Sequence, residues 1–543
     1  MKTKVGVPIL KGPGFIAKLR QIACDPLPVD PWPDLKYRNV LIAGVVGGEV
    51  HFSRMGIIGQ GLRMRGATVT LLQCDEFLPA CTMRKVDHYE SACTRWCHKN
   101  SGPFARAIGL PCRWYSEFIT PAERKECDRI AADVDLHALH AFEHRGVPLG
   151  EHVRQSIESF YKIGYFDAND PETAGMARQF VRAALYMTTV GFRALEQLKV
   201  DKVIEEDGKK VDWGVIRGVA GRMGIPVDVI RSGLGYYSIR FEHDRPPNRS
   251  AMMPEWDTWK HIPLTPEQEK ALDQYMLRRE RVPYEYRSAD WQTNTTDLRE
   301  ARRHAGLPDR IAGKVFGMFP NLSYDADRNK TVAAFESAND WITETIRFFC
   351  RRPEHHLVVK IHPSEKLWKA RDPLLPQIER EFPSLPPNIH VLPPESDVSA
   401  HAVARLSDWA LVYTSTVAAE AAALGKHVML VGGGWNAGRG FSHDVTSARD
   451  YFEKLEGICS GAWNPELRTD LARRYAYALF FRSNIRISWV TVLDLNVRSI
   501  NIRSLAELGP GQDAAMDAIC RSILCDEPCE DPSSRHPGEH API

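Results

Sequence analysis

The sequence has no long apolar run and no signal-peptide pattern at its start. No stretch of the 543 residues approaches the roughly 18 apolar residues that a membrane-spanning helix needs. The opening residues, MKTKVGVPILKGPGF, lack the long apolar centre of a secretory signal. These absences predict a cytoplasmic protein.

Cysteine is scarce, with 12 residues in the chain, and no Cys-x-x-Cys pair occurs. A disulfide scaffold needs a much higher cysteine content, and a structural zinc site needs a second pair of ligands. Cys93, Cys97 and His98 supply only one such group. We therefore expect neither a disulfide framework nor a bound metal.

The chain also lacks an excess of charge of one sign. Its formal net charge is +1, from 70 basic and 69 acidic residues. A basic surface of the kind that binds nucleic acid is absent at this level, so we expect no nucleic-acid partner. At this length the chain is too long for one hydrophobic core, and at least two large domains are predicted.

Two segments of the first half have the pattern of a strand, a turn, a helix and a second strand. The first runs from RNVLIAGVV (38–46) through the glycine-rich turn GGEVH (47–51) and a helix to ATVTLLQ (67–73). The second places the strands DKVIEE (201–206) and IPVDVI (225–230) around a helix. Repeated units of this kind predict a parallel sheet covered by helices.

Strands and helices alternate in the same way in the second half. Apolar strands are predicted at 314–319, 356–361, 388–392, 408–413 and 427–431. The fold class is therefore α/β, with two Rossmann-like doubly wound parallel-sheet domains facing a central cleft.

Composition suggests the boundaries between the parts. We predict a first Rossmann-like domain at 1–250, a proline-containing helical connection at 251–312, a second Rossmann-like domain at 313–460, helices that pack back across the domains at 461–524, and a disordered polar tail at 525–543.

The first candidate site residues follow the strand at 356–361. Pro363 cannot continue a strand ladder, so the strand ends at His362. In open parallel sheets, ligands bind beyond the carboxyl ends of the strands. Lys360, His362, Pro363 and Glu365 are therefore expected at a ligand-binding edge, unless His362 only caps a loop.

A second group follows the strand at 408–413. Tyr413, Thr414, Ser415 and Thr416 lead into an alanine-rich helix that ends near Gly425. Hydroxyl groups and free N–H groups at such a turn suit phosphate oxygens. Glu420, one turn into this helix, is placed to bind ribose hydroxyls, although a solvated glutamate is an alternative.

A glycine-rich segment, GGGWNAGRGFSHD (432–444), comes next. Three successive glycines allow the backbone to approach a ligand closely. Arg439 and Asp444 in this segment are expected to pair with charged or hydroxyl groups of that ligand.

The second half resembles a known family in the order of these motifs. FPNLSYDAD, the His-Pro-Ser-Glu turn, the Thr-Ser-Thr turn with its glutamate, and GRGFSHD occur together over residues 314–455. This combination resembles bacterial capsule and surface polysaccharide biosynthesis glycosyltransferases of GT-B architecture. The first half resembles the family only in outline.

The resemblance implies roles for the motifs. In such transferases the His-Pro and Ser/Thr motifs bind the phosphate and base side of a nucleotide, which here means His362, Pro363, Ser415 and Thr416. It implies a sugar nucleotide as substrate, with no cofactor and no metal. In the first half it implies an acceptor side, for which Gly47, Gly48 and His51 are candidates.

The stretch EEDG (205–208) carries the predicted base. Sugar transfer requires that an acceptor hydroxyl lose its proton while the nucleotide leaves with negative charge. Some sialyl- and Kdo-type transferases carry an acidic pair before a glycine, so Asp207 is the candidate base and Glu206 the second choice. His362 and Lys360 would stabilise the leaving group. Alternatively, EEDG is only a turn.

The partners implied are a nucleotide-sugar donor and a glycan or lipid-linked glycan acceptor, with possible peripheral contact with the inner membrane. The basic and apolar run LFFRSNIRISWVTVL (479–493) could support that contact, although a core segment also explains it.

Three other functions stay open. A sugar-nucleotide epimerase or hydrolase could use the same two-domain scaffold, because a fold does not fix a reaction. A noncatalytic sugar-binding assembly protein would bind a nucleotide without turnover. A nicotinamide-dependent oxidoreductase could use GVVGGEVHF with Asp75, although its glycines do not follow Gly-x-Gly-x-x-Gly.

Overall fold

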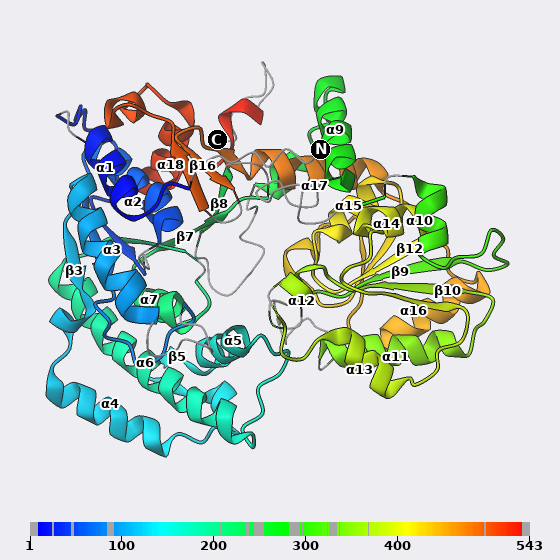
Figure 1. Ribbon diagram of the computed structural model, residues 1–543. Coiled ribbons are helices and arrows are strands. Elements are labelled where there is room, and N and C mark those ends of the chain that lie inside the picture. The colour runs from blue at the N-terminus through cyan, green and yellow to red at the C-terminus, as the bar shows by residue number, and fades with distance from the viewer. Residues whose placement is uncertain are drawn as a thin grey trace. The chain divides into compact units, whose positions relative to one another are not determined.

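The chain forms two compact units, each with its own sheet (Figure 1). The first unit comprises Met1–Phe160, Phe166–Pro246 and Phe481–Ala541, and the second comprises Tyr161–Tyr165, Pro247–Phe480 and Pro542–Ile543. The computed structural model describes residues 9–23, 26–44, 48–83, 92–206, 208–234, 238–243, 253, 255–281, 294–295, 297–322, 324, 334–335, 337–367, 369–493 and 496–534. Two predicted site residues, Gly47 and Asp207, lie outside the described residues.

The sheet of the first unit has the strand order β15-β8-β7-β6-β1-β2-β3. Its strands are β1 (Asn39–Ala43), β2 (Thr68–Gln73), β3 (Cys112–Trp114), β6 (Lys202–Glu205), β7 (Val227–Ser232), β8 (Ser238–His243) and β15 (Ile485–Arg486). The strands from β7 to β3 are parallel, whereas β8 is antiparallel to both β7 and β15. Two small hairpins complete the described strands of this unit: β4 (Glu143–His144) with β5 (Val147–Pro148), and β16 (Val490–Leu493) with β17 (Asn496–Ile500).

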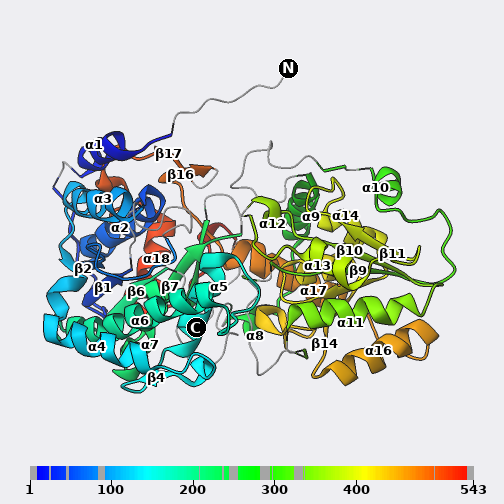
Figure 2. The same cartoon turned by 60° about the horizontal axis from the view of Figure 1, so that its bottom comes forward.

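Helices cover both faces of this sheet. They are α1 (Gly12–Ile22), α2 (Glu49–Met64), α3 (Ala92–Ile108), α4 (Pro121–Asp133), α5 (Gly150–Tyr161), α6 (Pro171–Gln197), α7 (Val211–Arg222) and α18 (Ala514–Cys525). Figure 2 shows α2 and α3 on one side of β1 and β2, and α6 and α7 on the other. Because both faces are covered, Val40 to Ala43 of β1 are all buried.

Helix α2 is buried on nearly all sides because α18 returns to cover it. The close approach depends on glycine, since a Cβ at Gly61 would collide with the Met516 side chain of α18. The last part of the chain thus belongs to the core of the first unit, as the shared hydrophobic cluster of Ile58, Met516 and Ile519 shows.

The sheet of the second unit is parallel throughout, with the order β11-β10-β9-β12-β13-β14. Its strands are β9 (Val315–Phe319), β10 (His356–Lys360), β11 (Ile389–Leu392), β12 (Trp409–Val412), β13 (His427–Leu430) and β14 (His443–Asp444). Its helices are α8 (Trp256–Trp259), α9 (Pro266–Arg281), α10 (Leu298–His304), α11 (Ala338–Cys350), α12 (Ser364–Leu367), α13 (Leu374–Glu381), α14 (Ala400–Leu406), α15 (Val417–Ala423), α16 (Ala448–Ser460) and α17 (Thr469–Tyr477).

These helices form two layers on the second sheet and part of a third. Figure 1 shows α14 and α15 on one side of the strands and α11 and α16 on the other. Helices α9, α10 and α17 pack on the outer side of α14 and α15. Both sheets are therefore doubly wound and Rossmann-like, which confirms the predicted α/β class with two Rossmann-like domains, and the predicted strands of the second half all form.

The C-terminal part differs from the prediction of helices followed by a disordered tail. Residues 461–524 contain α17, a π-helical turn (Ala478–Arg482), three strands and α18. In the tail, Glu530 is buried and its carboxylate accepts a hydrogen bond of 2.7 Å from Arg482 Nη1. Asp531 accepts one of 2.8 Å from the Arg486 backbone. Composition predicted a disordered tail at 525–543, but Arg482 and the Arg486 backbone hold Glu530 and Asp531 on the first unit, and residues 535–543 lie outside the described residues.

The run at 479–493 is a core segment. Its side chains Ile485, Ile487 and Trp489 are buried in the hydrophobic cluster of the first unit. This burial favours the alternative, a core segment, for the run. Among the described residues, no helix is long and apolar enough to cross a membrane.

Candidate functional site

The second sheet reverses its strand order between β9 and β12, where ligands of such folds bind. From β9 the chain builds β10 and β11 to one side and then β12 and β13 to the other. Asn321 follows β9 and Thr414 follows β12, and the two are joined: Asn321 Nδ2 donates to Thr414 Oγ1 at 2.8 Å, and Thr414 N donates to Asn321 Oδ1 at 3.2 Å. This pair marks the candidate donor edge of the second unit.

The Thr-Ser-Thr turn and the glycine-rich loop meet at this edge. Ser415 Oγ accepts from the Val417 backbone N–H at 3.3 Å, and the Ser415 carbonyl accepts from Asn436 Nδ2 at 2.9 Å. Thr416 makes no capping hydrogen bond to α15. Gly434 has φ +75°, and a Cβ there would touch Thr414. The structure thus brings the predicted turn and the predicted loop into contact.

His362 lies beyond β10, the strand beside β9. Its Nδ1 accepts the Ser364 backbone N–H at 3.1 Å. Burial, with a smaller effect from Lys360, lowers the pKa of His362 to about 4. At neutral pH the ring is therefore neutral with its proton on Nε2, so it can act as an N–H donor rather than as a cation.

Lys360 and Glu365 were predicted at the donor edge, but both are turned into the protein. The Lys360 ammonium is buried and lies 3.4 Å from the Pro393 carbonyl and 3.3 Å from the Ser396 carbonyl, and burial lowers its pKa to about 8. Glu365 accepts the Leu374 backbone N–H at 3.1 Å at the start of α13, and burial raises its pKa to about 7. Both side chains therefore fix local structure.

Tyr413 and Glu420 also differ from their predicted roles. The Tyr413 ring is buried against Trp341 in the hydrophobic core, at 5.7 Å between centroids. The Glu420 carboxylate is 2% exposed and contacts Arg279 of α9 and His401 of α14. The Tyr413 side chain thus points to the core at the end of β12. The Glu420 carboxylate is held by two protein side chains and not by a ribose.

Arg439 and Asp444 shape the glycine-rich loop. Asp444 accepts from the Gly438 backbone N–H and from Ser442 Oγ, both at 2.6 Å, and burial raises its pKa. Arg439 Nε donates to the Trp435 carbonyl at 3.1 Å. Each side chain bonds within the loop, so the two stabilise the loop that rests on Thr414.

The first sheet has its own reversal of strand order, between β1 and β6. Gly48 precedes α2, and His51 lies in the first turn of that helix, directly after β1. Glu206 is the first residue after β6. The His51 Nδ1 atom contacts Glu206 Oε2, and both side chains are partly buried. The structure thus joins a residue predicted for the acceptor side to one predicted for catalysis.

The end of β1 is held by a close backbone contact. Gly44 has φ +69°, and its carbonyl accepts a hydrogen bond from the Trp213 indole of α7. A side chain at Gly44 would collide with Trp213. Glycine is therefore required where β1 turns toward α2 and His51.

Two residues of the donor edge were missed by sequence reasoning. Asn321 lies in FPNLSYDAD, immediately after a predicted strand, and this position was the available signal. Asn436 is fully buried and bonds the Ser415 carbonyl. No local pattern identified Asn436, because its partner comes from a different strand end.

A cluster of possible metal-ligand side chains occurs in the first unit. Asp34, Cys525 and Glu527 lie close together among the described residues. The Arg521 guanidinium, however, contacts Asp34 at 2.6 Å and Glu527 at 3.5 Å. This cationic partner accounts for the acidic pair without an ion.

The chain matches no protein-family model and no curated protein sequence. Among solved structures, the fold is similar to the beta Kdo 2,4 transferase KpsC of Thermosulfurimonas dismutans, with 13% identity over 53% of this chain and 82% of that chain and a TM-score of 0.35. It is also similar to the UDP-GlcNAc 2-epimerase of Neisseria meningitidis bound to UDP-GlcNAc (13% identity, 81% and 96% coverage, TM-score 0.26) and to the glycosyltransferase SnogD of Streptomyces nogalater (12%, 82% and 96%, TM-score 0.24).

Proposed function

We propose that the protein is a glycosyltransferase that moves a sugar from a nucleotide-activated donor to a glycan acceptor in capsule or surface polysaccharide biosynthesis. The second unit would bind the donor and the first unit would supply the base. The enzyme would work in the cytoplasm, on a free or lipid-linked acceptor, without a metal ion or cofactor.

The His51–Glu206 pair carries this proposal. A carboxylate that holds the Nδ1 side of an imidazole fixes its orientation and leaves Nε2 to accept a proton. An acceptor hydroxyl needs such a base when it attacks the sugar carbon. Glu206 was predicted as a second choice of base, and the geometry favours it as the partner of His51. Asp207 lies outside the described residues, so its role as the base stays a prediction.

The donor edge supports the other half of the reaction. Asn321, Ser415 and Thr416 offer amide, hydroxyl and backbone N–H groups, and neutral His362 adds an N–H donor. The three carboxylates predicted for this edge, Glu365, Glu420 and Asp444, are each bonded to protein groups. An edge of this composition suits the oxygens of a nucleotide phosphate, whose negative charge grows as it leaves.

The test measures the thermal unfolding of the protein in the presence of CMP, CDP, UDP, GDP, ADP or NAD, each with and without magnesium. Ligand at a hundred times its dissociation constant should stabilise the protein by about 2.7 kcal/mol and raise the midpoint by a few degrees. We expect one pyrimidine nucleotide to give the largest shift, with little help from magnesium. No shift with any nucleotide would overturn the proposal.

A sugar-nucleotide epimerase is the second candidate, because an oriented imidazole can also abstract a proton from a sugar carbon. Incubation of the matching sugar nucleotide alone separates the two functions. Exchange of solvent deuterium into the sugar, with no acceptor present, indicates an epimerase. Release of nucleotide that depends on a glycan acceptor indicates a transferase.

A further inference from the structure

A buried ionic cluster joins three helices behind the donor edge. Arg279 Nη2 of α9 donates to Glu420 Oε1 of α15 at 2.9 Å, and His401 Nε2 of α14 lies 3.0 Å from Glu420 Oε2. The side chains of Arg279, His401 and Glu420 are 10%, 7% and 2% exposed. All three belong to the second unit.

The cluster keeps the Glu420 carboxylate ionised although this group is buried. Burial alone would raise the pKa of Glu420, but His401 and Arg279 together lower it to about 2. Removing one partner of such a group leaves a buried charge without compensation. Glu420 therefore stays ionised only while α9 and α14 keep their places against α15.

Helix α15 transmits this constraint to the donor edge. The Glu420 backbone N–H donates to the Thr416 carbonyl at 3.2 Å, so Glu420 lies one turn after the Thr-Ser-Thr turn. The helix has only seven residues, and its other residues are mainly alanine, which offer no polar anchor. The carboxylate is thus the one charged side chain that α15 contributes to holding its position.

We propose that Arg279 and His401 are positioning residues for nucleotide binding. Through Glu420 they fix α15, and α15 fixes the hydroxyl and N–H groups of Ser415 and Thr416. This inference rests on the proposed function of the donor edge. It replaces the expectation that Glu420 binds ribose.

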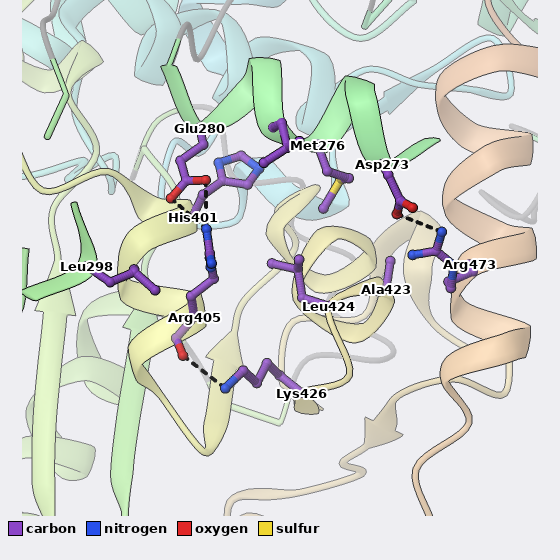
Figure 3. A pocket seen from close by; sticks show the side chains of 11 residues that line it. Asp273, Met276, Glu280, Leu298, His401, Arg405, Ala423, Leu424, Lys426 and Arg473 are labelled. Carbon is purple, nitrogen blue, oxygen red and sulfur yellow. Dashed lines mark hydrogen bonds and ion pairs between the residues drawn. The ribbon is translucent and has the colours of Figure 1, made fainter. Parts of the chain in front are cut away.

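A neighbouring ion pair provides a matched control. Arg405 Nη1 of α14 donates to Glu280 Oε2 of α9 at 3.0 Å, so among the described residues this pair joins the same two helices without including Glu420. Figure 3 shows this pair beside His401 on the wall of a cavity of about 540 Å³. Arg405→Met should therefore remove an α9–α14 ion pair and leave α15 in place.

The experiment compares Arg279→Met, Arg405→Met and Glu420→Gln in the full chain. Calorimetry would measure the affinity for CMP and UDP and for their 2′-deoxy forms. We expect Arg279→Met and Glu420→Gln to weaken ribonucleotide and deoxynucleotide binding equally, by about tenfold, because small displacements of a binding group have large effects. Arg405→Met should change affinity by less than about twofold and lower thermal stability less than Arg279→Met does, because Arg405 is more exposed than Arg279. Arg279→Lys should restore part of the affinity.

The outcomes separate the hypotheses. Unchanged affinity in a folded Arg279→Met variant would overturn the positioning role. A loss of affinity confined to the ribonucleotides would indicate that Glu420 binds the ribose, as expected from the sequence. If Arg279→Met does not fold, Arg279→Lys and Glu420→Gln decide together. Wild-type nucleotide affinity in both of these variants would contradict the proposal. Absence of nucleotide binding by the wild-type protein would instead overturn the proposed function.

Discussion

The two sheets end in different chemistry at their points of strand reversal. In the first unit, an imidazole at the start of the helix that follows β1 contacts the carboxylate directly after β6. In the second unit, the groups after β9 and β12 are an amide and a hydroxyl, and the predicted acids are bonded inward. The same fold therefore presents different groups at its two edges, as the proposed proton transfer at one and anion binding at the other require, because side chains and not topology decide the chemistry.

The largest expected effect comes from breaking the first edge. Glu206→Gln and His51→Ala should each lower sugar transfer by about a hundredfold or more, because a base acts mainly in the transition state. Nucleotide affinity should stay within about twofold in both. Steady-state transfer kinetics and calorimetry would measure the two quantities.

Asp207→Asn is the comparison for that experiment. If Asp207→Asn abolishes transfer while His51→Ala keeps it, the base is Asp207 and the His51–Glu206 pair is structural. Circular dichroism of each variant would verify that the unit still folds.

The second prediction introduces an acid at the second edge. Asn321→Asp places a carboxylate beside Thr414, where its charge would repel a phosphate, so it should weaken nucleotide binding more than Asn321→Ala, which only removes the two hydrogen bonds that hold Thr414. We expect about a tenfold loss for alanine and a larger loss for aspartate. Equal affinities for aspartate and wild type would show that no phosphate binds there.

His362→Ala and the double change Ser415→Ala/Thr416→Ala test the same edge. Each should weaken nucleotide binding by about 1–3 kcal/mol without unfolding the unit. Unchanged affinity in both variants would contradict the assignment of this edge.

The smallest effect concerns stability at mildly acidic pH. His390 and His443 lie near the amino ends of β11 and β14, opposite the donor edge, and contact His356 and His427 respectively. Burial lowers the pKa of His390 and that of His443 to about 4. The unfolded chain binds protons at these residues below about pH 6.5, whereas the folded chain does not until about pH 4. Stability of the second unit should therefore fall as pH decreases through this window.

The measurement is the thermal midpoint at pH 7.5 and at pH 5. His390→Asn should reduce the difference between the two midpoints by a few degrees, since it removes one titrating group. His137→Asn, at an exposed position of the first unit, is the control. An equal pH dependence in all three proteins would contradict the role of the buried pairs.

Much of the fold was predictable because it depends on local patterns. The apolar strands of the second half and their glycine-rich or hydroxyl turns are encoded within a few residues, as at β12 and Thr414. The antiparallel pair of β8 with β15 was not predicted, because Ile239 and Ile485 meet only after the chain has returned to the first unit.

Side-chain direction was the least predictable part of the site. Glu420 was assigned to a ribose from its place in α15, but its partner Arg279 lies 141 residues earlier in the chain. Glu365 was likewise assigned to the edge although it binds the Leu374 backbone. By contrast, Glu206 and His51 were candidates through the resemblance to the transferase family, and only their pairing required the structure.

Hydrogen–deuterium exchange with the nucleotide alone tests the central claim, that the two edges have separate tasks. A bound nucleotide protects the amides that it contacts or orders. We predict the strongest protection at residues 413–416 and 432–436 of the second unit, and little at 48–52 and 202–206 of the first. Protection confined to 48–52 and 202–206, with none at 413–416, would contradict the claim.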